Sequence, residues 1–243
     1  LPTIKSKYLD TIYRVKEGSY ITTLAKDIKE QKEFLSFPDY NDFKFIECRD
    51  EEIIPYLNEI VSKAIKKDIK VDNFQVLAPM YKGLNGIDNL NKNMSELFNK
   101  NEDKYLIGDK YYKINDKVIQ LVNDVENNVF NGDIGYITDI RNVDNKIFID
   151  IDYIGNNVTY TSTDSDKFNL AYAVSIHKSQ GSEYDNVVVV LAKSFSRMFY
   201  NKLLYTAVTR AKKSLIILGS IDSFNKSVKT LYATDRNTLM KNV

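Results

Sequence analysis

The stretch AYAVSIHKSQGSEYDNVVVVL, residues 171–191, predicts two buried strands joined by a polar loop. The first strand is predicted over residues 170–176. The second, residues 186–191, is an apolar run that suits a strand covered on both faces of a parallel sheet. Ligands of open parallel sheets bind at the carboxyl edge of the strands. We therefore expect the whole polar loop to lie at that edge.

Several groups in this loop suit phosphate and sugar oxygens. Ser175, His177 and Lys178 offer hydrogen-bond donors to phosphate, as do backbone N–H groups around Gly181. The Glu183 carboxylate can accept a hydrogen bond from a sugar hydroxyl. The alternative is a solvated loop with a capping serine, and the residue types alone do not separate the two interpretations.

A second candidate motif is LLYTAVTRAKK, residues 203–213, which predicts a helix leading into a strand at 214–218. Its Arg210 carries a planar, permanently charged guanidinium that can stabilise charge on a transferring phosphoryl group. The alternative is a surface arginine of a helix that also carries Lys212 and Lys213.

Two further places carry isolated polar candidates. Arg14 precedes a predicted helix, where a salt bridge at the helix start is the alternative interpretation. Pro79, Met80 and Lys82 follow a predicted buried strand, residues 74–78, and could border a nucleic-acid backbone at the carboxyl edge. A turn that ends the strand explains them almost as well.

Helical and strand patterns alternate along most of the chain, which indicates parallel β-α units. Predicted helices cover residues 19–32, with Ser19 as N-cap, a segment from about 50, and 87–98; a short strand covers 43–46. Short strands at 117–122, 135–138 and 146–149 instead indicate a small antiparallel barrel. We expect one α/β domain, residues 1–107 and 167–243, with a small β-barrel inserted at 108–166.

Composition excludes several classes of protein. The 243 residues have a net charge of +1, so a polyanion has to be bound by a local patch. One cysteine, Cys48, and one histidine exclude an internal disulfide and multi-thiolate zinc, so we expect no metal site and a reducing, cytoplasmic setting. No apolar run approaches the roughly 20 residues of a membrane span. No glycine precedes a lysine, which excludes the phosphate loop of nucleotide hydrolases. The sequence does not begin with Met, so we expect it to be a piece of a longer protein.

Taken in order, these segments resemble the C-terminal half of RecD-like superfamily 1 DNA helicases, the RecD/TraA group. Tyr13 and Arg14 resemble motif IV, and residues 76–91 resemble the P-M-x-x-G…G-x-x-x-L-N segment. Residues 108–135 resemble the entry to the family's inserted barrel, residues 171–183 resemble motif V, and residues 205–210 resemble motif VI. The strings HKSQGSE and YTAVTRA in this order are highly specific.

The resemblance implies a second RecA-like domain with an inserted SH3-like barrel. It implies that Arg210 is an arginine finger on the γ-phosphate of ATP and that Arg14 is a second γ-phosphate contact. Gln180, Gly181 and Glu183 would form the nucleotide side of motif V. Most of the site for ATP and Mg²⁺ would belong to a first RecA-like domain that this sequence does not resemble.

The resemblance also implies a single-stranded DNA track. Ser175, His177 and Lys178 would face the DNA backbone, and Pro79, Met80 and Lys82 would border the same track. The family usually has Gln where this chain has Val15, and Thr where it has Ser175. Ser175 keeps the hydroxyl of Thr, whereas Val15 lacks the amide of Gln.

The expected function is therefore ATP-driven 5′ to 3′ translocation on single-stranded DNA, with residues 1–243 inactive as an ATPase when alone. Expected partners are single-stranded DNA and the missing N-terminal RecA-like domain, with no membrane. The sequence leaves open whether the parent protein works alone or within a nuclease complex. It also leaves open whether that protein acts in repair, recombination or DNA transfer. The alternatives are a stand-alone, non-catalytic module that binds nucleic acid or protein, and the opposite polarity, whose enzymes usually carry a large helical insertion here.

Overall fold

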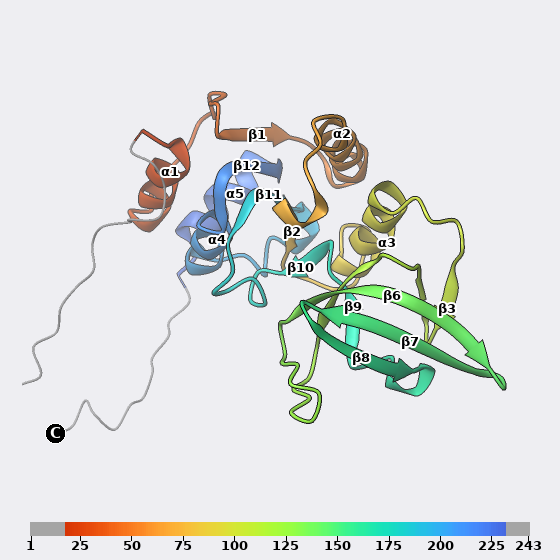
Figure 1. Cartoon of the computed structure of the whole chain (residues 1–243). Coiled ribbons are helices and arrows are strands. Elements are labelled where there is room, and N and C mark those ends of the chain that lie inside the picture. Colours follow the sequence, from red (N-terminus) through yellow and green to blue (C-terminus); the bar gives the residue numbers. More distant parts are fainter. Residues whose placement is uncertain (1–17, 232–243) are drawn as a thin grey trace, which may run out of the picture.

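The computed structural model describes residues 18–231 and contains a five-stranded parallel sheet (Figure 1). Its strands lie in the order β1 (Phe43–Glu47), β12 (Ala211–Gly219), β11 (Tyr184–Leu191), β2 (Phe74–Ala78) and β10 (Ala173–Ser175). Every neighbouring pair is parallel. β11 and β12 are central and longest because their apolar runs are buried on both faces.

Helices cover both faces of this sheet. One face carries α2 (Ile53–Lys66), which packs on β12, and α3 (Ile87–Phe98), which packs on β10; the other carries α1 (Tyr20–Lys29), α4 (Asn201–Val208) and α5 (Ile221–Lys229) (Figure 1). The predicted α/β class with a helix-flanked parallel sheet is thus confirmed. None of the helices within residues 18–231 is long and apolar enough to cross a bilayer.

The first helix forms where apolar spacing predicts it. Ile21, Leu24, Ala25 and Ile28 form its buried stripe. Ser19 occupies the N-cap position, but its hydroxyl donates to Asp42 and makes no cap hydrogen bond. The predicted N-cap position of Ser19 is therefore confirmed, but its side chain does not cap the helix, because its hydroxyl is bonded to a carboxylate.

A second, antiparallel sheet lies beside the parallel one. Its order is β8 (Asn156–Thr161), β7 (Lys146–Tyr153), β6 (Ile134–Val143), β5 (Lys117–Gln120) and β9 (Phe168–Leu170), and a separate hairpin of β3 (Tyr105–Ile107) and β4 (Lys110–Tyr112) precedes it. The sheet curls, since Tyr160 of β8 stacks on Phe168 of β9 with ring centroids 5.5 Å apart. Two interior hydroxyls, of Tyr153 and Tyr160, donate to Gln120. The expected small antiparallel barrel is thus a curled sheet with β8 and β9 at its ends.

The run at 170–176, predicted as one strand, is divided between the two sheets. Leu170 ends β9, which pairs with β5, whereas Ala173 begins β10, which pairs with β2. Between them the Ala171 N–H donates to Lys117 O, and Tyr172 O accepts from the Val76 N–H. The antiparallel sheet therefore extends past the expected insert boundary at 166. Hydrophobicity could not show this division because both halves are buried.

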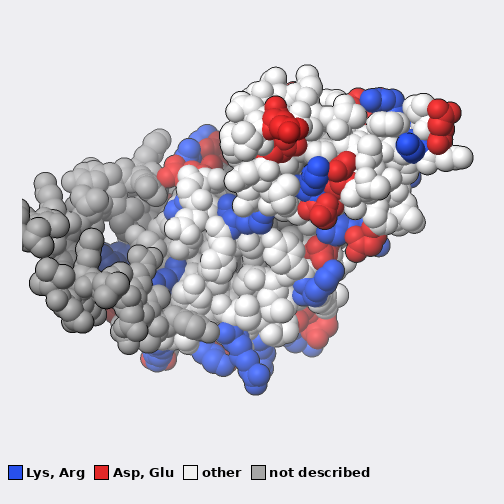
Figure 2. Space-filling model, turned by 90° about the horizontal axis from the view of Figure 1, so that it is seen from below, with Lys and Arg blue, Asp and Glu red and all other residues white. Residues whose placement is uncertain are grey.

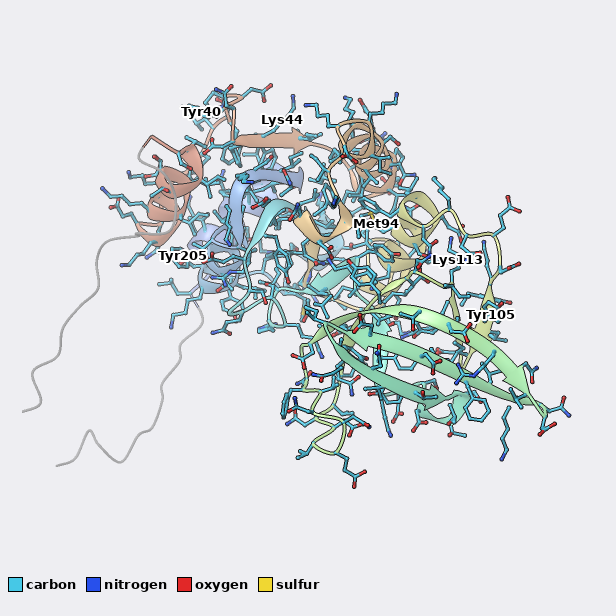
Figure 3. The ribbon with its side chains drawn as sticks, viewed as in Figure 1. Tyr40, Lys44, Met94, Tyr105, Lys113 and Tyr205 are labelled. Carbon is cyan, nitrogen blue, oxygen red and sulfur yellow. The ribbon has the colours of Figure 1, made fainter. Side chains whose placement is uncertain are left out.

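Buried polar side chains join the two sheets. Asp116, at the start of β5, accepts hydrogen bonds from Ser95 Oγ at 2.8 Å, Asn99 Nδ2 at 2.9 Å and Tyr172 OH at 2.9 Å. The neighbouring Lys113 lies between α3 and the antiparallel sheet (Figure 3), where its Nζ donates to Asn99 O at 2.8 Å. Such a fully bonded buried network specifies one orientation of the insert against the core.

Lys117, the next residue after Asp116, is only 2% exposed. Its Nζ donates to Val71 O and to Gln75 Oε1, each at 3.3 Å. Burial lowers the pKa of Lys117 to about 8, because removal from water disfavours the charged form.

Candidate functional site

The predicted site residues are divided between the two edges of the parallel sheet. Ser175 pairs with Ala78, the last residue of β2, whereas Asn186 pairs with Phe74, its first residue. The intervening segment 176–183 therefore runs back from the carboxyl edge to the amino edge, a return of about 13 Å at about 3.3 Å per strand residue. The prediction that all of this loop lies at the carboxyl edge is wrong, because β11 is parallel to β10 and has to start at the opposite edge.

The first part of segment 176–183 is one helix-like turn at the carboxyl edge. The Ser175 side chain accepts a hydrogen bond from the Lys178 N–H at 3.2 Å, and Ser175 O accepts one from the Ser179 N–H at 3.1 Å. Ser179 is fully buried and donates to Ile176 O. Ser175 is itself buried, so its hydroxyl organises this turn, while the His177 side chain is exposed.

The turn also brings the insert to the site. Lys178 Nζ donates to Asn131 Oδ1, in the loop between β5 and β6, at 3.0 Å. Desolvation lowers the pKa of Lys178. A side chain predicted to face DNA is therefore held in place by the antiparallel sheet, a contact between residues 47 positions apart that sequence patterns do not indicate.

The last part of segment 176–183 lies at the amino edge. Gln180 and Gly181 are exposed, and Gly181 has a φ of +95°, a left-handed conformation that glycine adopts without strain. Ser182 O then accepts a hydrogen bond from Arg210 Nη1 at 2.9 Å. The structure thus brings the end of the predicted motif V against the end of the predicted motif VI.

Arg210 is buried between α4 and β12. It is 6% exposed, and its Nε and Nη2 donate to Thr206 O at 3.1 Å and to Thr209 Oγ1 at 3.2 Å. The Tyr184 N–H donates to Arg210 O at 2.9 Å, which fixes the backbone as well. The alternative of a surface arginine on a charged helix is therefore wrong, because the helix ends at Val208.

The lysines after Arg210 belong to β12 and face acidic partners just before and within β11. Lys212 forms an ion pair with Glu183 at 3.4 Å, and Lys213 forms one with Asp185 at 2.8 Å. These pairs link the starts of β11 and β12 at the amino edge, next to Arg210. The predicted sugar-binding carboxylate of Glu183 already has an ion-pair partner in this arrangement.

The loop after β2 forms the neighbouring part of the carboxyl edge. Pro79 and Met80 are half-buried, and Lys82 is exposed and paired with Asp88 at 2.9 Å. A Cβ on Gly86 would lie 2.5 Å from the carbonyl oxygens of the two residues before Gly83, so only glycine permits this close turn. The loop is compact because its backbone folds directly onto the start of α3.

Sequence reasoning assigned no role to Asn91, the last residue of the L-N pair. Its Nδ2 donates to Leu170 O and Ala173 O, each at 2.9 Å, and its Oδ1 accepts from the Ala173 N–H at 2.7 Å. Asn91 therefore anchors β10, the strand that delivers Ser175. The signal that could have found it is a polar residue on the apolar stripe of the predicted helix. In the same way, Gln75 is a polar residue within a predicted buried strand, and it donates to Tyr172 O at 2.9 Å.

Arg14 and Val15 lie outside the described residues, so the structure does not position the predicted motif IV. Within residues 18–231, no group of three or more His, Cys, Asp and Glu side chains is placed to hold a metal ion. Among the predicted site residues, the amino edge holds the guanidinium of Arg210, the carboxylate of Glu183 and Gly181, which has open space beside it. These groups fit one wall of a nucleotide site, with a cation toward phosphate, and leave the remaining walls to another surface.

The charges on the surface do not form one continuous field. On the face drawn in Figure 2, Lys and Arg side chains form separate groups with acidic side chains among them and a wide uncharged area between. This distribution agrees with the net charge of +1 and with the need for locally placed cations.

Two protein-family models match the chain. The UvrD-like helicase C-terminal domain matches residues 170–218, and the ATP-dependent RecD-like DNA helicase SH3 domain matches residues 90–151. The first match contains β10, segment 176–183, α4 and Arg210; the second contains β5, β6 and most of β7.

Similar proteins agree with these matches. The ATP-dependent RecD2 DNA helicase of Deinococcus radiodurans is 35% identical over 150 residues, 62% of this chain and 20% of that protein. The RecBCD enzyme subunit RecD of Buchnera aphidicola is 30% identical over 181 residues, 71% of this chain and 29% of that protein. The chain thus spans less than a third of the length of these two relatives.

The fold has a counterpart among solved structures. A Pif1 helicase from Bacteroides, crystallised with ADP-AlF3 and single-stranded DNA, has a TM-score of 0.51 at 17% identity, over 85% of this chain and 50% of that one. This likeness concerns the fold. Together with the motifs and their geometry, the family matches show that the chain belongs to the RecD-like superfamily 1 DNA helicases and carries their C-terminal helicase domain and SH3 domain.

Proposed function

We propose that this chain is the second motor domain, with its SH3-like insert, of an ATP-dependent DNA helicase that moves 5′ to 3′ along single-stranded DNA. The observation that supports this most is the course of segment 176–183. One short segment begins among the predicted DNA contacts at the carboxyl edge and ends against Arg210 at the amino edge. A shift of either end is therefore transmitted to the other through a few bonded residues.

At the amino edge, Arg210 acts in this proposal as the arginine finger, with Gln180, Gly181 and Glu183 beside the nucleotide. ATP with Mg²⁺ supplies the phosphoryl group, and a first RecA-like domain holds most of it. The guanidinium is held by backbone carbonyls and can meet charge on the γ-phosphate without reorganisation. Arg14 is the second γ-phosphate contact in the same proposal.

At the carboxyl edge, His177, Lys178 and Lys82 contact the phosphates of a single strand, and Pro79 and Met80 border its path. Ser175 holds the turn that presents Lys178. Closure of the two motor domains on ATP pulls the amino edge inward, and segment 176–183 transmits this movement to the DNA contacts. Single-stranded DNA, the first motor domain and, by analogy with the relative named as a RecBCD subunit, a nuclease complex are the proposed partners, in the cytoplasm.

The test is strand displacement by a helicase that contains this chain, with 5′-tailed and 3′-tailed duplexes offered in parallel. We expect unwinding of the 5′-tailed duplex only; unwinding of the 3′-tailed duplex alone would reverse the proposed polarity. Residues 1–243 alone should hydrolyse no ATP above background. Robust turnover by this piece would contradict the division of the nucleotide site between two domains.

A further inference from the structure

The loops that follow β10, β2 and β11 lie side by side at the carboxyl edge. The three strands are neighbours in the sheet, and Val189 of β11 pairs with Leu77 of β2, so their carboxyl ends are level. The proposed DNA contacts occupy the first two loops only. The third loop, residues 192–200, continues the same row at the strand spacing of about 4.8 Å.

This third loop is held firmly against the second one. The Asp50 carboxylate accepts hydrogen bonds from the Lys193 N–H at 2.7 Å and the Ser194 N–H at 3.0 Å. Asp50 O accepts one from the buried Asn85 Nδ2, in the loop after β2, at 2.9 Å. The two loops therefore share Asp50 as an anchor and present one surface.

The cations on the third loop differ from those at the amino edge. Lys193 and Arg197 are exposed, and within residues 18–231 neither forms an ion pair or a side-chain hydrogen bond. Lys212 and Lys213 at the opposite edge both face carboxylates. Unpaired cations in a row with Lys178 fit a polyanion, since no internal carboxylate has to be displaced.

Large apolar side chains are exposed beside these cations. Tyr81, after β2, is 40% exposed, and Met198, after β11, is 46% exposed. Unstacked bases pack on such side chains, with about 1–3 kcal/mol per base on an aromatic ring. A duplex hides the faces of its bases, so this combination fits a single strand.

We infer that the loop between β11 and α4 is a third part of the single-strand path, where Lys193 and Arg197 bind phosphates and Tyr81 and Met198 contact bases. This inference rests on the proposed function and extends it to residues outside the predicted motifs. Asp50 acts here as a positioning residue, because it fixes the backbone from which Lys193 projects.

The experiment is fluorescence anisotropy of labelled oligo(dT) with residues 1–243 over a series of salt concentrations. The Lys193→Ala/Arg197→Ala double variant should bind about 3- to 10-fold more weakly, and the slope of log affinity against log salt should fall by about 0.7 per lost contact. Tyr81→Ala should weaken binding without changing the slope, and Tyr81→Phe should restore it. Asp50→Asn should lower the affinity for oligo(dT). Its thermal unfolding temperature should stay close to that of Asp50→Glu.

The matched control is Lys66→Ala/Lys146→Ala, which removes two exposed lysines from the end of α2 and from the start of β7. An unchanged slope in Lys193→Ala/Arg197→Ala overturns the inference. If Lys178→Ala still weakens binding in that case, the proposed function stands without it. If unaltered residues 1–243 do not bind oligo(dT), both fail, and equal losses for oligo(dT) and a blunt duplex contradict the single-strand assignment.

Discussion

The amino and carboxyl edges of the parallel sheet carry their cations in opposite ways. At the amino edge Arg210 is almost fully buried and its donors point at fixed oxygens of its own chain. At the carboxyl edge His177, Lys193 and Arg197 are exposed. The guanidinium of Arg210 is positioned before any ligand arrives, whereas the exposed side chains of His177, Lys193 and Arg197 depend on a ligand for their order.

The difference has a physical cause. Burial of a cation is costly unless its donors are satisfied, so the fold has to set the position of Arg210 to within a hydrogen bond. An exposed cation keeps its water and gives modest, salt-dependent attraction. Changes at the amino edge should therefore alter a reaction rate, and changes at the carboxyl edge should alter binding.

The largest effect should come from Arg210→Ala in a helicase that contains this chain. DNA-stimulated ATP hydrolysis should fall by about 10³-fold or more, since charge on the γ-phosphate loses its guanidinium, while oligo(dT) affinity should change by less than about twofold. Lys212→Ala is the control at the same edge and should retain most activity. An equal loss in both variants, with unchanged thermal unfolding, would erase the distinction between the edges.

The next effect concerns Lys117, which is buried beside the start of β2. Its pKa falls to about 8 on folding, so between about pH 8 and 10.5 the unfolded chain binds a proton that the folded chain does not. The free energy of unfolding should thus rise with pH in this range, by roughly 3 kcal/mol relative to Lys117→Met. Urea unfolding of both proteins at several pH values measures this, and identical pH slopes would show that Lys117 keeps an ordinary pKa.

Asn91→Ala should destabilise the carboxyl edge by about 2–3 kcal/mol, because it leaves three buried backbone groups without their partner. Asn89→Ala is the control on the same helix: Asn89 is exposed and donates one hydrogen bond, to Leu84 O. Urea unfolding should show a cost of less than about 1 kcal/mol for this control. Equal costs would mean that Asn91 does not anchor β10.

The smallest effect should be that of Lys178→Ala on binding of oligo(dT) by residues 1–243. A loss of severalfold, with a salt slope lower by about 0.7, is expected for one phosphate contact. Lys212→Ala, at the amino edge, should leave the slope unchanged. Binding that is indifferent to salt in the unaltered chain would argue against phosphate contacts altogether.

Local patterns predicted many elements closely. The strand at 74–78 and the helix at 87–98 have the expected bounds, because Pro79 ends the first and an apolar stripe marks the second. The motifs also singled out Arg210 and segment 176–183, which are in contact in the structure. The division of residues 170–176 between two sheets was missed, since burial by different partners leaves the same apolar pattern.

The order of strands and helices, the β-rich insert and the family are properties that can be read along the chain, because they depend on periodicity and on short motifs. The edge at which each motif lies, the burial of Arg210, the hold of Asn131 on Lys178 and the anchor at Asp50 are not. They arise from pairings between segments distant in sequence, such as Asn186 with Phe74. Parallel strands oblige the chain to return across the sheet, and that return places the group proposed for the nucleotide and the groups proposed for DNA at opposite ends of one short segment.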